Sequence, residues 1–309
     1  MIYDLIIIGG GPAGISAGIY ASRQRMKTLL ISKEFGGQMA KKATEVCNYL
    51  GFPRIKGPEL IKKFAEHLKT QEFIETKMAE IRKIEKNGDS FSVVTTENEK
   101  LSGSSIIIAT GADPRPLEVS GEKEFIGRGI SYCVTCDGPI FKNKSIAIIG
   151  GGNAGFEAGI FMTNYASKVY ILECGPEMKA DPDNQEEARK LKKINVFVNA
   201  EVKEIKGDKT VKSLIYEDLK SKKRKVLAVQ GVFVEIGAQP ATSLAKGLVD
   251  FNERDEIKVG FETCQTKTPG LFAVGDANIG KYKQIITAAG EGCKAALAAY
   301  EYVRRQKRK

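Results

Sequence analysis

The stretch Leu5-Ile6-Ile7-Ile8-Gly9-Gly10-Gly11-Pro12-Ala13-Gly14 decides the fold, because it places a glycine-rich turn directly after an apolar run. We interpret the run as a buried strand and the small residues through about Arg23 as a helix; Thr28-Leu29-Leu30-Ile31 then supplies a second parallel strand. The spacing of Gly9, Gly11 and Gly14 matches G-x-G-x-x-G, which permits a tight turn and close approach of a pyrophosphate. A glycine turn alone is a weak signal, but its place between strand and helix predicts a dinucleotide site.

The same pattern returns much later in the chain. Ser145-Ile146-Ala147-Ile148-Ile149 leads into Gly150-Gly151-Gly152-Asn153-Ala154-Gly155, a helix to about Tyr165 and the strand Lys168-Val169-Tyr170-Ile171-Leu172. Two distant copies of one strand–turn–helix–strand unit indicate two nucleotide-binding domains and not a short-period repeat.

The segments between and after these copies predict how the domains are connected. Residues 91–96 alternate as an antiparallel strand does, and residues 105–111 form a buried strand that ends in a turn. Pro114 and Pro116 mark a crossing, and a second crossing is expected near residues 237–243. A strand at residues 271–274 and a helix from about 285 to 303 would rejoin the first domain. We therefore predict an α/β fold with domains 1–113 plus 244–309 and, inserted between them, 114–243.

Composition agrees with two globular domains and excludes other classes. The chain has 309 residues and no run of about 18 apolar residues that would span a membrane. Its first residues have no basic segment or cleavage site, so we expect a cytoplasmic protein. The net charge of +10 is concentrated at residues 220–225 and 304–309 without a nucleic-acid-binding motif. We interpret these charges as solvated surface that can steer an acidic partner protein.

Two dinucleotide sites in one chain suggest a flavin and a nicotinamide, with hydride transfer between them. The sequence Cys133-Val134-Thr135-Cys136-Asp137 suggests the next acceptor. Cysteines at this spacing can close a readily reduced disulfide, in which one thiol attacks a substrate and the other resolves the mixed disulfide. Asp137 can carry the proton that the exchange requires.

A zinc half-site and an inert pair of core thiols are the competing interpretations of this pair. Zinc would require a second C-x-x-C or paired histidines, and His67 is the single histidine. That count also leaves no histidine base near the C-terminal end, so Asp137 is the acid–base candidate by elimination. Cys47, Cys174, Cys264 and Cys293 are interpreted as buried or incidental thiols.

In combination, these motifs resemble the low-molecular-weight thioredoxin reductases and the flavoprotein core of the alkyl hydroperoxide reductase F subunit. The matching segments span nearly the full length of the chain. They are residues 9–14, 35–38, 45–49, 109–112, 133–137, 150–155, 275–276 and 282–285.

The resemblance implies two Rossmann-like domains, an FAD domain and an inserted NAD(P)H domain that carries the redox pair. It also implies a homodimer in which the inserted domain rotates, with Cys136 facing FAD and Cys133 attacking the partner. The FAD site it implies is Gly9, Gly11, Pro12, Ala13, Gly14, Ser32, Gly36, Gly37, Gln38, Asn48, Thr110, Gly111, Gly275, Asp276, Lys283, Gln284 and Ile285. The nicotinamide site it implies is Gly150, Gly152, Asn153, Ala154, Gly155, Glu157, Glu173 and Gly237.

The sequence departs from the thioredoxin reductase pattern at the nicotinamide site. Members that use NADPH carry His-Arg-Arg-x-x-x-Arg after the second strand, whereas here residues 173–179 read Glu-Cys-Gly-Pro-Glu-Met-Lys. Glu173 lies 18 positions after Gly155, where an acidic residue binds the ribose 2′-hydroxyl of NADH and repels a phosphate. We predict a preference for NADH over NADPH, with Lys179 left as one possible phosphate contact.

The partner is expected to be a separate thioredoxin or glutaredoxin-like protein, because the chain begins at the FAD strand without the thioredoxin-like extension of the peroxide-reductase flavoprotein. Two alternatives remain open at this point. One is a family member reduced by ferredoxin or another electron carrier. The other is a flavin-binding redox sensor without turnover.

Overall fold

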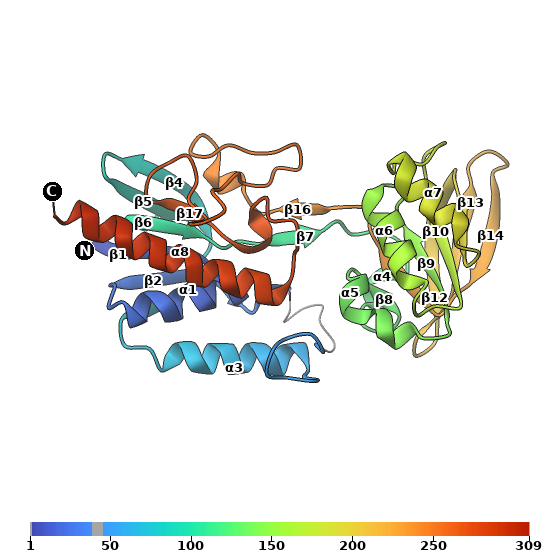
Figure 1. The fold of residues 1–309 in the computed structure, drawn as a ribbon, viewed down its shortest axis with the longest axis horizontal. Coiled ribbons are helices and arrows are strands. Elements are labelled where there is room, and N and C mark those ends of the chain that lie inside the picture. The colour runs from blue at the N-terminus through green and yellow to red at the C-terminus, as the bar shows by residue number, and fades with distance from the viewer. Residues whose placement is uncertain (1, 39–45, 309) are drawn as a thin grey trace. The chain divides into compact units, whose positions relative to one another are not determined.

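A computed structural model of the chain describes residues 2–38 and 46–308. The chain divides into two compact units, Met1–Asp113 with Gln239–Lys309 and Pro114–Ala238 (Figure 1). Residues 239–243, which we expected in the inserted domain, lie in the first unit, where the Ala241 N–H donates to the Gly111 carbonyl. The expected α/β class, with one nucleotide-binding fold inserted into another, is confirmed.

The first unit is built on a seven-stranded sheet. Its strands are β1 (Ile2–Gly10), β2 (Thr28–Phe35), β3 (Ile74–Met78), β4 (Ile81–Asn87), β5 (Ser90–Thr95), β6 (Lys100–Ile108) and β17 (Leu271–Ala273). The order is β3-β2-β1-β6-β5-β4, with β17 beside β6. β1 pairs in parallel with β2 and β6, so its apolar run is central and buried, and β5 pairs antiparallel with β4 and β6 as predicted.

Alternate residues of β1 point to opposite faces of the sheet and contribute to two separate apolar layers. Leu5 and Ile7 belong to the layer that α1 (Pro12–Arg23) and α8 (Ile285–Gln306) share, and both helices lie on one face in Figure 1. α1 and α8 approach closely at Gly292, where a Cβ would lie 2.1 Å from the Ala13 carbonyl oxygen. The remaining elements of the unit are the helix α3 (Gly57–Lys69) and the 3-10 turns η2 (Ser243–Ala245) and η3 (Gly275–Ala277).

The second unit contains a five-stranded sheet in the order β11-β10-β9-β15-β8, with all its pairs parallel. These strands are β8 (Ile130–Ser131), β9 (Ser145–Ile149), β10 (Lys168–Leu172), β11 (Ile194–Phe197) and β15 (Gly231–Val234). An antiparallel sheet adds β12 (Ala200–Gly207), β13 (Val211–Asp218) and β14 (Lys223–Ala228). The helices are α4 (Glu122–Phe125), α5 (Val134–Asp137), α6 (Asn153–Met162) and α7 (Pro182–Lys190), and η1 (Gly138–Phe141) is a 3-10 turn.

Several element ends differ from expectation, and α6 is the clearest case. α6 ends at Met162 instead of near Tyr165, because the side chains of Thr163 and Asn164 bond back to the carbonyls of Ile160 and Phe161. β15 ends at Val234. The connections between the units, β7 (Ala112–Pro114) and β16 (Ala238–Pro240), pair with each other. No helix in residues 2–38 or 46–308 is long and apolar enough to cross a membrane.

Candidate functional site

The first glycine turn is fixed by backbone packing that only glycine permits. Gly9 has φ +117°, and a Cβ there would lie 2.2 Å from the Ala109 carbonyl oxygen. A Cβ on Gly14 would lie 1.9 Å from the Gly9 carbonyl oxygen, whereas one on Gly11 would meet nothing within 4 Å. Gly11 begins α1 without a side-chain cap, and Pro12 occupies the first turn. The helix therefore offers uncapped N–H groups above an open glycine, which is the arrangement that binds a pyrophosphate.

The second glycine turn repeats this geometry. Gly150 has φ +128°, and its Cβ would lie 2.3 Å from the Glu235 carbonyl oxygen. The Cβ of Gly155 would lie 1.9 Å from the Gly150 carbonyl oxygen, and Gly152 is open. Gly152 begins α6, again without a side-chain cap. The second unit thus contains an equivalent turn, with an open glycine at an uncapped helix start.

Other residues predicted for the second turn have different surroundings. Ala154 and Glu157 are exposed on α6. Asn153 holds the start of α7 instead of facing outward, since its amide donates to Asp181 at 2.8 Å and its oxygen accepts the Asp181 N–H at 2.7 Å. Gly237 has φ +96° and its carbonyl accepts the Arg115 N–H at 3.0 Å, beside the connection between the units.

In each unit, a side chain in or directly after the next strand accepts a backbone N–H of the glycine turn. Ser32 Oγ accepts the Gly10 N–H at 2.9 Å, and Glu173 Oε2 accepts the Gly151 N–H at 2.8 Å. The other oxygen of Glu173 accepts the Gly175 N–H at 2.7 Å. Burial alone would raise the pKa of Glu173, but these backbone hydrogen bonds outweigh it and the pKa is lowered. A carboxylate is therefore held beside the second turn and a neutral hydroxyl beside the first.

Residues at the carboxyl ends of β2 and β6 complete the predicted flavin side of the first unit. Gly36, Gly37 and Gly111 all have positive φ values, of 110°, 55° and 70°. The amide nitrogen of Gln38 donates to Asp113, while its oxygen is a buried side-chain atom without a hydrogen-bond partner among the described residues. Thr110 donates to the Ala241 carbonyl at 2.7 Å. Glu45, in a segment matched by the resemblance, lies outside the described residues.

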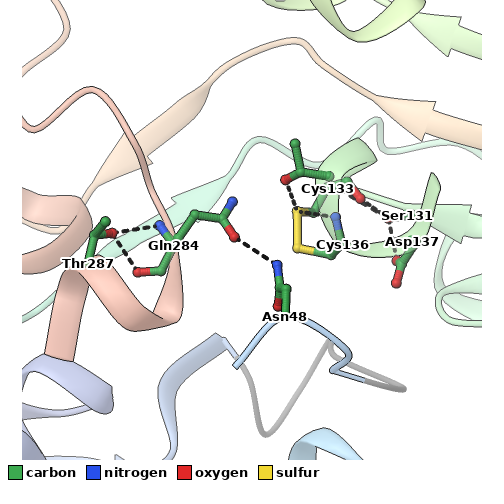
Figure 2. Close-up of a disulfide and its surroundings, with 8 residues drawn as sticks. Asn48, Ser131, Cys133, Cys136, Asp137, Gln284 and Thr287 are labelled. Atoms are coloured by element: carbon green, nitrogen blue, oxygen red, sulfur yellow. Dashed lines mark hydrogen bonds between the residues drawn. A yellow bond between two sulfur atoms is a disulfide. The ribbon is translucent and has the colours of Figure 1, made fainter. Parts of the chain in front are cut away.

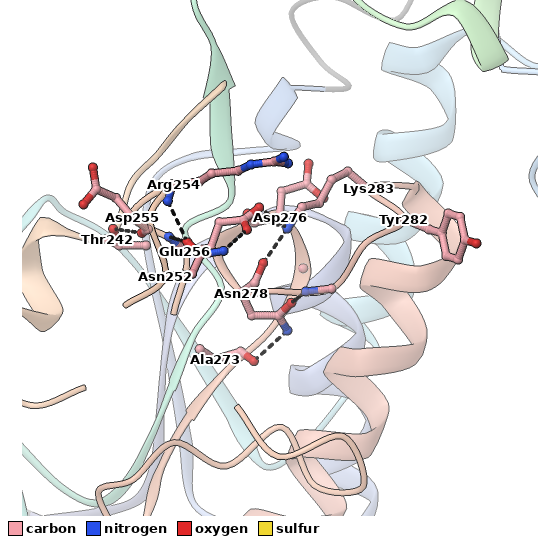
Figure 3. Close-up of polar contacts among 12 residues, drawn as sticks. Thr242, Asn252, Arg254, Asp255, Glu256, Ala273, Asp276, Asn278, Tyr282 and Lys283 are labelled. Carbon is pink, nitrogen blue, oxygen red and sulfur yellow. Dashed lines mark hydrogen bonds and ion pairs between the residues drawn. The ribbon is translucent and has the colours of Figure 1, made fainter. Parts of the chain in front are cut away.

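A polar cluster surrounds Gly275 and Asp276 (Figure 3). Burial raises the pKa of Asp276, and nearby Lys283 acts against that rise. Lys283 Nζ pairs with Glu256 Oε1 at 2.9 Å and donates to the Asn278 carbonyl. The predicted cofactor residue Lys283 is thus also the anchor of its own loop.

Two residues that hold this loop were not identified from sequence. Glu291 of α8 accepts the Gly275 N–H at 2.7 Å and the Asn278 amide at 2.8 Å. Glu256 neutralises Lys283. The available signal for Glu291 was an acidic residue within the alanine- and glycine-rich part of the helix, and the sequence does not show which loop lies beside it.

Gln284 and Ile285 lie where α8 begins. Gln284 forms a capping box with Thr287, and its Oε1 accepts the Asn48 amide at 3.2 Å (Figure 2). Ile285 packs against the apolar cluster of Val46, Ile55, Leu60 and Ile61. The predicted residues Asn48 and Gln284 are therefore brought together from opposite ends of the chain.

Cys133 and Cys136 form a disulfide with 5.3 Å between their Cα atoms (Figure 2). Cys133 precedes α5, and its Sγ accepts the Cys136 N–H at 3.2 Å. Thr135 Oγ1 lies 3.3 Å from the same sulfur. Both contacts bring an N–H or O–H group to the Cys133 sulfur.

Asp137 and its surroundings include residues that sequence reasoning missed. Ser131 donates to Asp137 Oδ2 at 2.6 Å. Tyr132 donates to buried Glu122 Oε1 at 2.5 Å, and Glu122 also accepts the N–H groups of Leu117 and Glu118, each at 2.7 Å. Ser131 thus holds Asp137 of the redox turn, and Glu122 holds Tyr132, which directly precedes Cys133. Their hydrogen bonds to Asp137 and Tyr132 span 6 and 10 residues, but no residue pattern marks them in the sequence.

Comparison with known proteins gives the family. The model of the pyridine nucleotide-disulphide oxidoreductase family matches residues 3–292. An NADH dehydrogenase of Bacillus subtilis is 38% identical over 301 residues, and the F subunit of the alkyl hydroperoxide reductase of Escherichia coli is 38% identical over 309 residues. These alignments cover 97% and 99% of the chain but 58% and 59% of the relatives, so the chain spans about three fifths of their length.

Solved structures resemble the whole chain. Thioredoxin reductase from Streptococcus pyogenes is 34% identical with a TM-score of 0.93, and that from Giardia duodenalis is 33% identical with a TM-score of 0.93. Each comparison covers 98% of this chain and 99% of the other.

Proposed function

Since the chain belongs to the pyridine nucleotide-disulphide oxidoreductase family, we propose that it is a flavoenzyme that uses NADH to reduce the disulfide of a thioredoxin or glutaredoxin-like protein. The observation that carries this proposal is the Cys133–Cys136 disulfide beside Asp137, within the unit that contains the second glycine turn.

The first unit has the features that FAD binding requires. Gly11 leaves open space at the uncapped start of α1, and the Gln38 oxygen is buried without a partner among the described residues. Gly275 stands beside α1, with a Cβ position only 3.3 Å from the Ala13 side chain. The chemistry that FAD supplies when bound is two-electron transfer between a reduced nicotinamide and a disulfide.

The cysteine pair performs thiol–disulfide exchange with the partner. The Cys133 thiolate attacks one sulfur of the partner disulfide, forming a mixed disulfide and releasing the other sulfur as a thiolate that takes up a proton. Cys136 then attacks Cys133, which closes the pair and frees the second partner thiol. Two electrons and two protons pass from the pair to the partner. Asp137 takes a proton from the reduced pair and returns it to the leaving thiolate.

Glu173 supports NADH as the donor. Its carboxylate is held at the end of β10, tied to Gly151 of the phosphate-binding turn, and its lowered pKa keeps it anionic at neutral pH. A 2′-phosphate at this position would meet a like charge, whereas a ribose hydroxyl can donate to it. Lys179 is exposed and its backbone N–H bonds to Gly151, so it adds one positive charge nearby. We expect kcat/KM for NADH to exceed that for NADPH by at least about tenfold.

A homodimer is part of the proposal. Phe261 and Leu297 of the first unit are 89% and 38% exposed, and apolar side chains of this kind are covered in subunit interfaces. Light scattering of the FAD-loaded protein is expected to give twice the chain mass, and a monomer at micromolar concentration would contradict this part.

The central test uses the FAD-loaded protein, NADH and NADPH in parallel, and a thioredoxin-like disulfide protein. Anaerobic NADH is expected to bleach the flavin absorbance, and the partner's thiols are expected to appear with turnover. Cys133→Ser and Cys136→Ser should each lower partner reduction by at least about a thousandfold, because both sulfurs are consumed in the exchange. Cys293→Ser, outside the pair, serves as the matched control.

Two outcomes would contradict the proposal. Partner reduction by a Cys133→Ser, Cys136→Ser double variant would remove the redox pair from the mechanism. Flavin that is not bleached by millimolar NADH or NADPH would leave another electron carrier as the donor.

A further inference from the structure

We propose that Ser131 is a positioning residue that orients the Asp137 carboxyl and stabilises its ionised form during thiol–disulfide exchange. This inference rests on the proposed function, because it assigns Ser131 a role in the proton transfer of the redox pair. Nothing in the local sequence distinguishes Ser131 from a structural strand serine. Its contacts do so (Figure 2).

The direction of the Ser131 hydroxyl proton follows from its contacts. A serine oxygen has one proton to donate and two lone pairs to accept with. The Cys133 N–H donates to Ser131 Oγ at 3.1 Å, which uses a lone pair. The possible acceptors of the proton are Asp137 Oδ2 at 2.6 Å and the Cys133 carbonyl at 3.4 Å. The short distance to the carboxyl directs the proton to Asp137, in a hydrogen bond whose length is typical of an anionic acceptor.

Ser131 is held by the sheet and not by the redox turn. It ends β8, pairs with Phe233 of β15, and is 6% exposed, while Phe233 is completely buried. Asp137 ends the four-residue helix α5, which has no buried residues of its own. The Ser131 hydroxyl is therefore the point at which a buried strand residue fixes the orientation of a carboxyl on a short, half-buried turn. The same oxygen holds the backbone of Cys133.

This geometry predicts a specific change in pH dependence. A donated hydrogen bond stabilises the carboxylate over the carboxylic acid, so its loss raises the pKa of Asp137. Loss of one hydrogen bond to a charged group is expected to move the acid limb of the exchange rate upward by about one pH unit. The rate should fall by up to about tenfold on that limb and remain unchanged at higher pH.

The test measures single-turnover reduction of a thioredoxin-like disulfide by the pre-reduced, FAD-loaded protein from pH 5 to 9. Ser131→Ala should shift the acid limb upward, Ser131→Thr should restore it, and Asp137→Asn should remove it. Ser105→Ala is the matched control, because Ser105 is also a buried strand serine and donates to the Asp4 carbonyl at 2.8 Å in the other unit. If Ser131→Ala folds poorly, Ser131→Val is compared with Ser131→Thr, because these two side chains have nearly the same shape and only threonine has a hydroxyl.

A second readout does not depend on turnover. The infrared carboxyl band that Asp137→Asn removes should titrate at a higher pH in Ser131→Ala than in the wild-type protein. If the band and the rate in Ser131→Ala both titrate at the same pH as in the wild-type protein, the role of Ser131 is overturned and the proposed function stands. An unchanged pH profile in Asp137→Asn would instead overturn the acid–base role of Asp137, and the inference with it.

Discussion

The two glycine turns share a backbone and differ in the charges placed beside it. In both, the first glycine packs on a carbonyl of a neighbouring strand segment and the last packs on the first. In both, the second glycine donates to a side chain 22 residues later, but the acceptor is the Ser32 hydroxyl in one and the Glu173 carboxylate in the other. The carbonyl under the first glycine belongs to Ala109 in one turn and to Glu235 in the other. Packing thus sets the same backbone in both turns, and the charge of the accepting side chain is what differs between them.

The largest expected effect comes from adding a side chain to the last glycine of one turn at a time. A Cβ at Gly14 or Gly155 would lie 1.9 Å from a backbone oxygen, so Gly14→Ala and Gly155→Ala should each destabilise their unit by about 3 kcal/mol or more. Gly14→Ala should lose FAD, whereas Gly155→Ala should keep FAD and lose reduction by NADH. Flavin absorbance after purification and anaerobic NADH titration measure the two effects. Loss of both functions in both variants would show that the turns are not independent.

Gly11→Ala and Gly152→Ala provide the matched controls, because a Cβ at either position meets nothing within 4 Å. Both should leave the melting temperature of the cofactor-free protein unchanged. Each should weaken only its own dinucleotide, since the new methyl group occupies space that the pyrophosphate needs. Isothermal titration of FAD and of NADH separates the two, and a lowered melting temperature would contradict the open geometry.

Substitution of Glu235 gives the next largest effect on the free energy of unfolding, and the size of that effect depends on pH. Burial raises the pKa of Glu235 from its usual 4.5 to about 7. Its contribution to stability is therefore fully present below pH 4.5 and is lost as pH rises through 7. Glu235→Gln should be more stable than the wild-type protein at pH 8, by about 3 kcal/mol, and similar to it at pH 4. Urea unfolding at both pH values measures this, and an equal difference at both would contradict it.

Substitutions of Glu173 and Ser32 give the smallest effects on the free energy of unfolding. They compare the two side chains that each accept a backbone N–H of a glycine turn. Glu173→Gln leaves one of two backbone N–H groups without an acceptor and should cost about 2 kcal/mol at pH 7. Because the pKa of Glu173 is lowered, this difference should persist above its usual 4.5 and diminish as pH falls below it. Ser32→Ala removes a neutral hydrogen bond and should cost about 1 kcal/mol at either pH. Urea unfolding of both variants at pH 7 and pH 4 distinguishes charge from simple hydrogen bonding.

Local patterns predicted most of the fold and only part of the site. The strand–turn–helix units are readable because apolar runs, glycines and small helical residues are adjacent in sequence. The roles of Ser131, Glu122 and Glu291 are not readable, because each depends on where the side chain points in the folded chain and not on a residue pattern. The pairing of Ser131 with Phe233 joins residues more than a hundred positions apart. Single polar residues within apolar or alanine-rich segments have no local signal that separates anchor from surface.

The connection between the units has a consequence for how such a chain can be assembled and rearranged. The Ala241 N–H bonds to the Gly111 carbonyl and the Arg115 N–H bonds to the Gly237 carbonyl, each at 3.0 Å, so the chain leaves the host and returns to it at one point. A coding segment inserted or exchanged there interrupts the host at a single surface position, and a short hairpin suffices to rejoin the cut ends. The second unit is in this sense a separate insertion within the first unit. Recombination at this junction would therefore exchange the second unit without rebuilding the sheet of the first.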